Sequence, residues 1–230
     1  MSKAKDSAID KARREKAEQT DVLILAALPH VPFDGWSIKS LELAAESIDI
    51  DPSAVRRYFP EGVKDAIAHF IDLADRLMVE DLKAYDLESM KIRERVTTGV
   101  RVRLERWTPH REAIRRALLL APLPPFVGET MRGWYKTVDA IWRTAGDKST
   151  DFNFYTKRGL LAAVYGTTLL YWLDDKSENC ANTWAFLDRR IADVMKVPQI
   201  KGRITERLKK VSSPRGLFGR LSHRRATGFR

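Results

Sequence analysis

The sequence predicts an all-α protein, and three observations support this fold class. Apolar residues recur at three- and four-residue spacing through most of the chain, as in amphipathic helices. No segment shows the two-residue alternation flanked by turn residues that is typical of a β-strand. Residues Gly159 to Leu173 form an uncharged run that is shorter than the ~20 residues needed to span a bilayer. This run predicts a core helix covered nearly all round by protein or ligand.

The first half of the chain predicts four helices, separated by prolines and capping residues. Ser37 and the Asp51-Pro52 pair have the residue types that begin helices, and Pro29 ends the first apolar stripe. A turn is expected at residues 33–36. The four predicted helices are residues 8–28, Ser37–Ser47, Ser53–Tyr58 and Val63–Leu82.

The second half continues as helices, and the prolines at residues 122–125 are read as a stop signal. The predicted helices are Met90–Trp107, His110–Leu120, Glu129–Ala145, Ser149–Asp174 and Cys180–Met195. The predicted organisation is a charged segment (1–19), a helix-turn-helix-like module (20–82), a helical body (83–198) and a basic tail (199–230).

The net charge of +10 lies almost entirely in the tail. Ten of the 41 Lys and Arg and one of the 31 Asp and Glu fall in residues 199–230, which therefore carry +9. Residues 1–198 carry 31 basic and 30 acidic groups, a net charge of +1. The basic character therefore predicts a partner for the tail and not a phosphate-binding body.

The sequence contains none of the motifs that mark common catalytic centres. Its four histidines are far apart, and no H-x-x-H, Glu-x-x-His, G-x-S-x-G, P-loop or G-x-G-x-x-G motif occurs. Cys180 could act as a nucleophile, but a lone cysteine near a helix start is more often a small packing residue. We expect a protein that is not an enzyme, with no metal. A stand-alone enzyme is the less favoured alternative.

Residues 20–82 resemble the N-terminal domain of TetR-type regulators, with the Tyr58-Phe59 pair as the specific part of the match. In that family the short third helix enters the major groove of DNA. A TetR-type transcriptional regulator is therefore the leading alternative function. It is disfavoured because Ser53–Tyr58 offers mainly Arg56 and Arg57 to DNA and because the body is nearly neutral.

Four blocks resemble the accessory lipid-binding family of ubiquinone biosynthesis, whose members share the TetR-like fold. The blocks are residues 28–36 (LPHVPFDGW), 139–142 (DAIW), 146–158 (GDKSTDFNFYTKR) and 183–191 (TWAFLDRRI). The resemblance implies a protein that binds an isoprenoid quinone intermediate and presents it to the di-iron hydroxylase acting on demethoxyubiquinone. No cofactor is expected, but a bound isoprenoid quinone or phospholipid is.

The resemblance also implies a docking patch for that hydroxylase. The patch maps onto Asp151, Asn153, Phe154, Tyr155 and Arg158. Family members often carry Trp at the position of Phe154, so this chain keeps the aromatic ring and lacks the N–H donor. Packing of Phe154 and Tyr155 over the loop near Lys148 is the alternative to an exposed hot spot.

The predicted helices Glu129–Ala145 and Ser149–Asp174 carry wide aromatic stripes. Such stripes are more often packed core than the wall of a ligand pocket, but the resemblance favours a pocket. Its expected lining is Val100, Leu104, Trp134, Ile141, Trp142, Tyr165, Leu169 and Trp172. Because TetR-like folds commonly form dimers through their last two long helices, we expect a homodimer through Ser149–Asp174 and Cys180–Met195.

The tail has an apolar face among basic residues, typical of an interfacial helix on anionic lipid. The expected membrane-binding residues are Ile200, Arg203, Ile204, Arg207, Leu208, Lys210, Val211, Leu217, Phe218 and Leu221. A disordered basic tail and a nucleic-acid partner are the alternatives. Because residues 1–19 contain four acids and no apolar core, we expect no targeting signal and a bacterial, cytoplasmic protein on the inner membrane surface.

Overall fold

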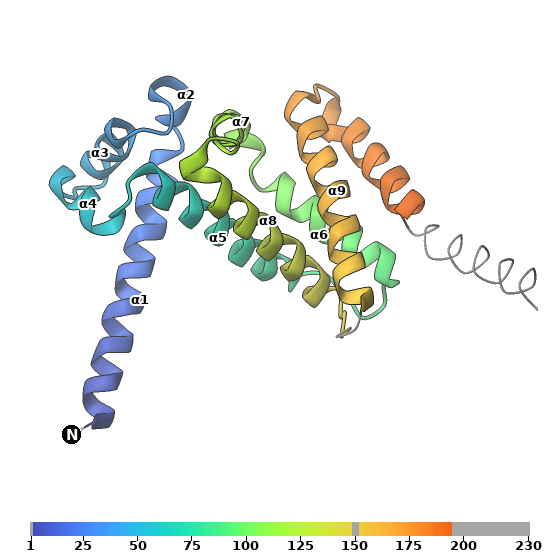
Figure 1. Ribbon diagram of the computed structural model, residues 1–230, viewed down its shortest axis with the longest axis horizontal. Helices are drawn as coiled ribbons and strands as arrows, with labels where there is room; N and C mark the ends of the chain where they lie inside the picture. Colours follow the sequence, from blue (N-terminus) through green and yellow to red (C-terminus); the bar gives the residue numbers. More distant parts are fainter. Residues whose placement is uncertain (1, 149–151, 195–230) are drawn as a thin grey trace, which may run out of the picture. The chain divides into compact units, whose positions relative to one another are not determined.

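The structure is a computed structural model that describes residues 2–148 and 152–194; for residues 2–10, 152 and 153 it describes the backbone alone. The chain divides into two compact units, residues 1–187 and 188–230. The first unit holds the numbered helices (Figure 1). In the second unit, the described residues 188–194 are helical. All regular structure in the described residues is helical, which confirms the all-α prediction.

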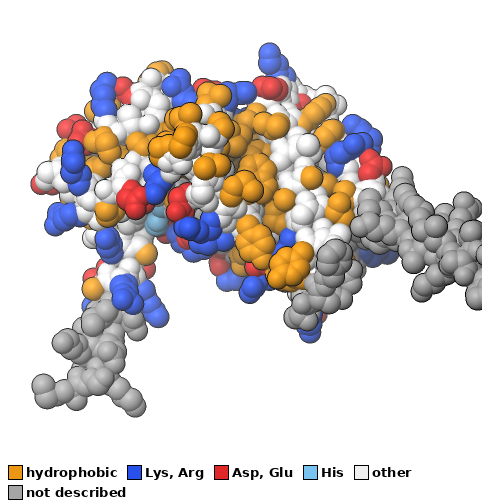
Figure 2. Space-filling model, in the orientation of Figure 1, with side chains coloured by type: hydrophobic (Ala, Val, Ile, Leu, Met, Phe, Trp, Pro, Cys, Tyr) orange, Lys and Arg blue, Asp and Glu red, His pale blue; other side chains and the backbone are white. Residues whose placement is uncertain are grey.

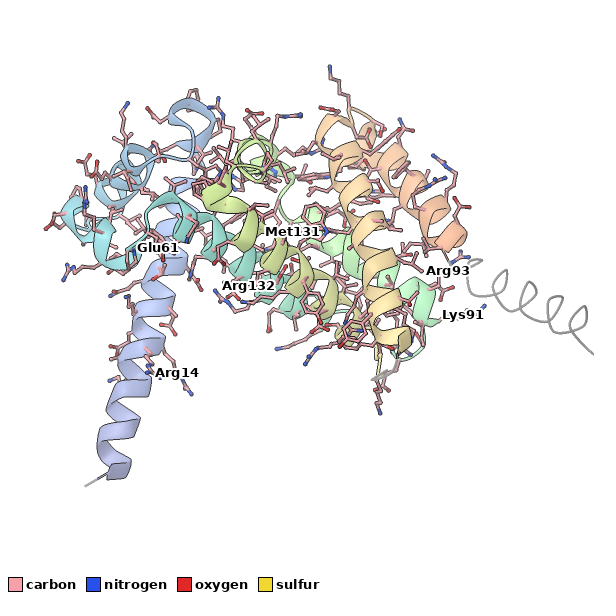
Figure 3. All side chains as sticks on the ribbon, in the orientation of Figure 1. Arg14, Glu61, Lys91, Arg93, Met131 and Arg132 are labelled. Atoms are coloured by element: carbon pink, nitrogen blue, oxygen red, sulfur yellow. The ribbon has the colours of Figure 1, made fainter. Side chains whose placement is uncertain are left out.

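The N-terminal module consists of three main helices joined by short helical segments. α1 (Ser2–Ala27) packs against both α3 (Ile38–Ser47) and α5 (Val63–Leu82). The segments between them are α2 (Val31–Asp34), the 3-10 helix η1 (Pro52–Ala54) and α4 (Val55–Tyr58). α1 begins before the predicted residue 8; residues 2–7 carry no apolar stripe that would predict a helix, although Lys3, Ala4 and Lys5 favour one. Residues 11–19 of α1 are all exposed, and Arg14 among them is labelled in Figure 3.

Both predicted capping sites begin helices in the structure. The Ser37 hydroxyl accepts the N–H of Ser40 at 3.1 Å, and the Ser40 hydroxyl accepts the N–H of Ser37 at 3.1 Å. This reciprocal capping box satisfies two backbone donors at the start of α3. Asp51 Oδ1 accepts the N–H of Ser53 at 2.9 Å, which caps η1. Each such cap stabilises the protein by about 1 kcal/mol.

The second half of the first unit is a bundle around α8 (Pro124–Thr144). α8 packs against α5, α6 (Ile92–Glu105) and α9 (Phe152–Asp174). The remaining segments are η2 (Thr108–His110), α7 (Arg111–Leu120), η3 (Glu178–Cys180) and a helix that begins at residue 181. α7 lies against α2 and α9, so it connects the N-terminal module to the bundle.

The start of α8 differs from the prediction. Pro124 and Pro125 were interpreted as a stop and the helix was expected from Glu129, but both prolines lie in the first turn of α8. A first turn tolerates proline because its N–H groups have no intrahelical acceptor. The extra turn extends α8 to the end of α7.

Within the described residues of one chain α9 is buried on one side only, so the chain itself does not cover this helix nearly all round. Leu161, Leu169 and Trp172 are buried in the core. The opposite face is exposed, and it consists of small, polar and aromatic residues: Gly159, Ala163, Thr167, Leu170 and Tyr171. Gly159, Ala163 and Thr167 are small or weakly polar, whereas Leu170 and Tyr171 are large apolar residues that are 59% and 41% exposed.

Candidate functional site

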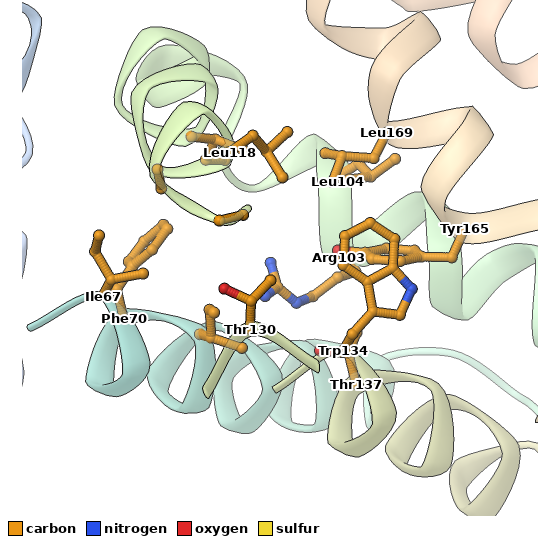
Figure 4. A pocket seen from close by; sticks show the side chains of 14 residues that line it. Ile67, Phe70, Arg103, Leu104, Leu118, Thr130, Trp134, Thr137, Tyr165 and Leu169 are labelled. Carbon is orange, nitrogen blue, oxygen red and sulfur yellow. The ribbon is translucent and has the colours of Figure 1, made fainter. Parts of the chain in front are cut away.

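A partly enclosed cavity lies where α5, α6, α7, α8 and α9 meet. Its volume is about 70 Å³. α5 contributes Ile67 and Phe70, α7 contributes Leu118, and the walls are mainly apolar (Figure 4). A typical ligand pocket has a volume of roughly 300–1,000 Å³, so a whole lipid fits only when the walls separate.

Half of the predicted lining residues border this cavity. Leu104, Trp134, Tyr165 and Leu169 lie in its wall, with the Trp134 and Tyr165 rings packed edge to face at 5.5 Å between centroids. The Trp134 Nε1 donates to the carbonyl of Ala162 at 3.3 Å, which fixes the indole against α9.

The other four predicted lining residues lie elsewhere in the core. Val100 and Ile141 are fully packed between α6 and α8. Trp142 donates from Nε1 to the carbonyl of Lys157 at 3.1 Å, and the Arg111 guanidinium covers Trp172 at 4.6 Å from the ring centroid. Helical spacing predicted their burial, but it does not tell which buried side chains border an empty space.

A buried polar cluster borders the cavity, and the sequence interpretation missed it. Arg103 on α6 donates from Nε to Asp75 Oδ1 on α5 at 2.9 Å. The Thr137 hydroxyl on α8 lies 2.9 Å from both carboxylate oxygens of Asp75. One signal in the sequence could have predicted that Asp75 is buried. Asp75 follows Ile67 and Ile71 at four-residue spacing, so it lies on the apolar face of α5.

Burial raises the pKa of the Asp75 carboxyl above its usual value, while its contacts with Arg103 and Thr137 oppose the rise. Burial also disfavours charged Arg103, but Tyr165 and Asp75 outweigh this and raise its pKa. Burial raises the pKa of the Tyr165 hydroxyl as well, so Tyr165 is a neutral hydrogen-bond donor at neutral pH. The cluster therefore combines a fixed cation, its counter-ion and a hydroxyl at the edge of an apolar space.

The predicted docking patch begins at the start of α9, and Arg158 is its buried anchor. Arg158 lies 2.6 Å from Asp139 and 3.1 Å from Asp147, and its own side chain is 4% exposed. Lys157 also binds Asp147, at 2.7 Å. These ion pairs fix the start of α9 against α8 and the segment that follows α8. Arg158 thus contributes to the patch by positioning it, because its guanidinium is not at the surface.

The aromatic residues of the patch lie beside that anchor. Tyr155 is 69% exposed, and Phe154 is half-buried with the Arg158 guanidinium 3.4 Å from its ring centroid. The Phe154 and Tyr155 rings pack edge to face at 5.1 Å. The side chains of Asp151 and Asn153 lie outside the described residues, and so do all the predicted membrane-binding residues from 200 to 221.

An exposed apolar stripe, which runs from the N-cap residue Leu123 along α8, was not predicted. Leu123, Val127, Met131 and Tyr135 recur every fourth residue, and each is between 45% and 66% exposed. Figure 2 shows apolar side chains gathered over this part of the surface, and Met131 is labelled in Figure 3. An apolar stripe of this kind is typical of a surface that another molecule covers.

The helix-turn-helix-like module presents little surface suited to reading DNA. α4, at the place of a recognition helix, has four residues, of which Arg56 and Arg57 are exposed. The Tyr58 hydroxyl donates to Gln19 of α1 at 2.8 Å, so this side chain is engaged within the module.

The described residues contain no group of three or more His, Cys, Asp or Glu arranged to hold a metal ion. Cys180 is buried, and Arg111 Nη2 donates to its Sγ at 2.6 Å. No helix in the described part of the chain has the length and apolar character needed to cross a membrane.

Residues 127–198 match the COQ9 family model, a range that covers most of α8, all of α9 and the helix that begins at residue 181. The mitochondrial ubiquinone biosynthesis protein COQ9 of Homo sapiens is 34% identical over 189 residues, 79% of this chain. The chain belongs to the COQ9 family. COQ9 of Drosophila melanogaster is 34% identical over 193 residues, 82% of this chain. This member of the COQ9 family spans 59% of the length of both relatives.

A crystal structure of a TetR transcriptional regulator from Nitrosomonas europaea matches with a TM-score of 0.63. The match covers 77% of this chain and 98% of the regulator at 17% sequence identity. This likeness confirms the predicted TetR-like fold of the COQ9-family chain and says nothing about DNA binding.

Proposed function

We propose that this chain is a non-catalytic accessory protein of ubiquinone biosynthesis that binds an isoprenoid quinone intermediate in the cavity between α5 and α9. The single observation that carries the proposal is the apolar cavity inside the bundle of a COQ9-family chain, because closely packed cores contain few voids larger than a water molecule. α7 forms one wall, and its cavity-facing Ala117 and Leu118 are half-exposed. Outward movement of α7 enlarges the cavity for the lipid.

A filled-cavity variant tests this binding. Ala117→Trp places an indole at the cavity wall, whereas Ala12→Trp places one on the exposed part of α1 as a matched control. Native mass spectrometry of the purified full chain should show an isoprenoid lipid bound to the wild type and to Ala12→Trp. Ala117→Trp should lose it. Equal lipid content in all three proteins would overturn the cavity assignment.

The partner in this proposal is the di-iron hydroxylase that acts on demethoxyubiquinone, and it docks on the start of α9. The exposed ring of Tyr155, the half-buried ring of Phe154 and the apolar stripe of α8 supply the apolar surface that such a contact needs. Tyr155→Lys, at a ring that is 69% exposed, should abolish binding of the hydroxylase in a pull-down while the melting temperature stays close to that of the wild type. Phe33→Lys, at an 84% exposed aromatic on α2, is the matched control and should bind normally.

Two further parts of the proposal concern assembly and location. The exposed face of α9 supports a homodimer, and Thr167→Glu should then shift the protein to a monomer in analytical ultracentrifugation. The basic, periodically apolar tail supports attachment to the cytoplasmic surface of a bacterial inner membrane. Removal of residues 199–230 should abolish flotation with anionic liposomes; equal flotation would rule out the tail as the anchor.

A TetR-type regulator is the second candidate, favoured by the fold and by the exposed Arg56 and Arg57 of α4. A gel shift at physiological salt decides between the two. The accessory function predicts no retarded DNA, and a retarded band that Arg56→Ala and Arg57→Ala remove would establish the regulator.

A further inference from the structure

Arg103 extends a charged group into an otherwise mainly apolar cavity. Its side chain is 6% exposed, and its guanidinium end points into the space between α5, α7 and α8 (Figure 4). Its Nε donates to Asp75. Within the described part of the chain, its two Nη groups donate to no protein acceptor. Neither Nη atom is among the fully buried, unpartnered side-chain nitrogens of the described residues, so both reach open space and can donate to an acceptor that enters the cavity.

The charge of Arg103 is already compensated inside the protein. Asp75 lies 2.9 Å away and is held from its other side by the Thr137 hydroxyl. An anion that entered this neutral, buried pair would lose its hydration without gaining a net counter-charge. An uncharged carbonyl or phenol oxygen has much less hydration to lose and can still accept from the Nη groups. The arrangement therefore favours an uncharged oxygen.

We propose that Arg103 binds an uncharged ring oxygen of the ligand, such as a quinone carbonyl, with the Tyr165 hydroxyl as a second donor. Asp75 and Thr137 are positioning residues that orient the guanidinium and cancel its charge. The volume of about 70 Å³ suits an oxygen-bearing ring edge and not a whole lipid. The isoprenoid chain of the ligand then leaves the cavity past Leu118. This inference rests on the proposed function, since it assigns the head-group contact of the same cavity.

The test uses three probes with the full-length protein. They are a benzoquinone with a two-isoprene tail, a saturated fatty acid of similar length, and squalene, which has no polar head. Wild-type protein should bind the quinone at least about tenfold more tightly than the fatty acid. Arg103→Lys keeps the ion pair with Asp75 but removes the guanidinium Nη groups that would donate to the ligand oxygen. It should weaken quinone binding about tenfold and leave squalene binding unchanged.

Asp75→Asn tests the charge of the pair, because a merely structural role of Asp75 would not change the ratio of quinone to fatty-acid affinity. It leaves the cation of Arg103 uncompensated, so binding of the fatty acid should gain at least about tenfold relative to the quinone. Arg106→Met is the matched control, because Arg106 lies just after α6 and pairs with Asp81 outside the cavity lining. It should change no affinity.

The outcomes separate the two proposals. If Arg103→Lys and Asp75→Asn leave the ratio of quinone to fatty-acid affinity unchanged while squalene still binds, the head-group assignment is overturned and the lipid cavity stands. If both variants bind all three ligands more weakly and by the same factor, the head-group assignment is also overturned. If the wild-type protein binds none of the three, the proposed function fails together with the assignment.

Discussion

Arg158 and Arg143 bind the same carboxylate, one from the protein interior and one from the surface. Comparing the two therefore measures how much burial of an ion pair changes the free energy of unfolding. Arg158 Nε lies 2.7 Å from Asp139 Oδ1, and Arg143 Nε lies 2.6 Å from Asp139 Oδ2. The Arg158 side chain is 4% exposed, whereas that of Arg143 is 72% exposed. Replacing each with Met removes a comparable contact from the buried and from the exposed side of Asp139.

Loss of one partner from a buried ion pair destabilises a protein by roughly 3–5 kcal/mol, whereas an exposed pair contributes about 0–1 kcal/mol. Arg158→Met leaves Asp147 with Lys157 and Asp139 with Arg143, so we expect the lower end, about 3 kcal/mol. For a chain of this size that lowers the melting temperature by roughly 6–12 °C. Arg143→Met should lower it by roughly 0–4 °C.

Urea denaturation followed by circular dichroism measures both variants, with thermal melting as the second readout. The slope of the unfolding free energy against urea should match the wild type, which shows that the unfolded state is unchanged. If Arg158→Met is no more destabilising than Arg143→Met, the buried network does not hold the start of α9. The positioning role of Arg158 would then be wrong.

Three further predictions follow from single contacts. A Cβ at Gly166 would lie 2.7 Å from Trp134 Cζ2, so Gly166→Ala should push the indole into the cavity and reduce lipid retention in native mass spectrometry; unchanged retention with higher stability would contradict this. Slight burial opposes ionisation of Asp175, but hydroxyl and backbone donors lower its pKa to about 2, below the unfolded value. Its stabilisation is therefore complete above roughly pH 4 and lost as the pH falls towards 2, so Asp175→Asn should lower the melting temperature at pH 6 and hardly at pH 2. Trp36 Nε1 donates to the carbonyl of Ala113 at 2.8 Å, and Trp36→Phe should cost about 1 kcal/mol in urea denaturation, because that carbonyl keeps its helical bond.

The helices could be predicted because their signals are local. Ser37 caps α3, and the apolar spacing of α5 gives its buried face, from short stretches of sequence. The start of α8 was missed because Pro124 suits both the end of one helix and the first turn of the next. Only the end of α7 and the packing of α8 on α5 decide between them.

The candidate site could be predicted only in part, because a cavity depends on how several helices pack together, and the pattern within one helix does not show this. Trp134 and Trp142 both lie on the apolar face of α8, yet only Trp134 reaches the cavity. The pair of Asp75 and Arg103 joins residues 28 positions apart on different helices. No local pattern pairs these two residues, and only the fold brings them together. Arg158 was assigned to the surface by resemblance, and its burial depends on Asp139 and Asp147.

The central claim is that the bundle of this COQ9-family protein holds an isoprenoid quinone intermediate. Lipid extraction of the purified full chain, followed by mass spectrometry, tests it most directly, with Ala117→Trp prepared in parallel. We predict an isoprenoid lipid at a stoichiometry near one per chain in the wild type and its loss in the variant. Absence of any isoprenoid from the wild type, together with no binding of an added short-chain quinone, would contradict the account.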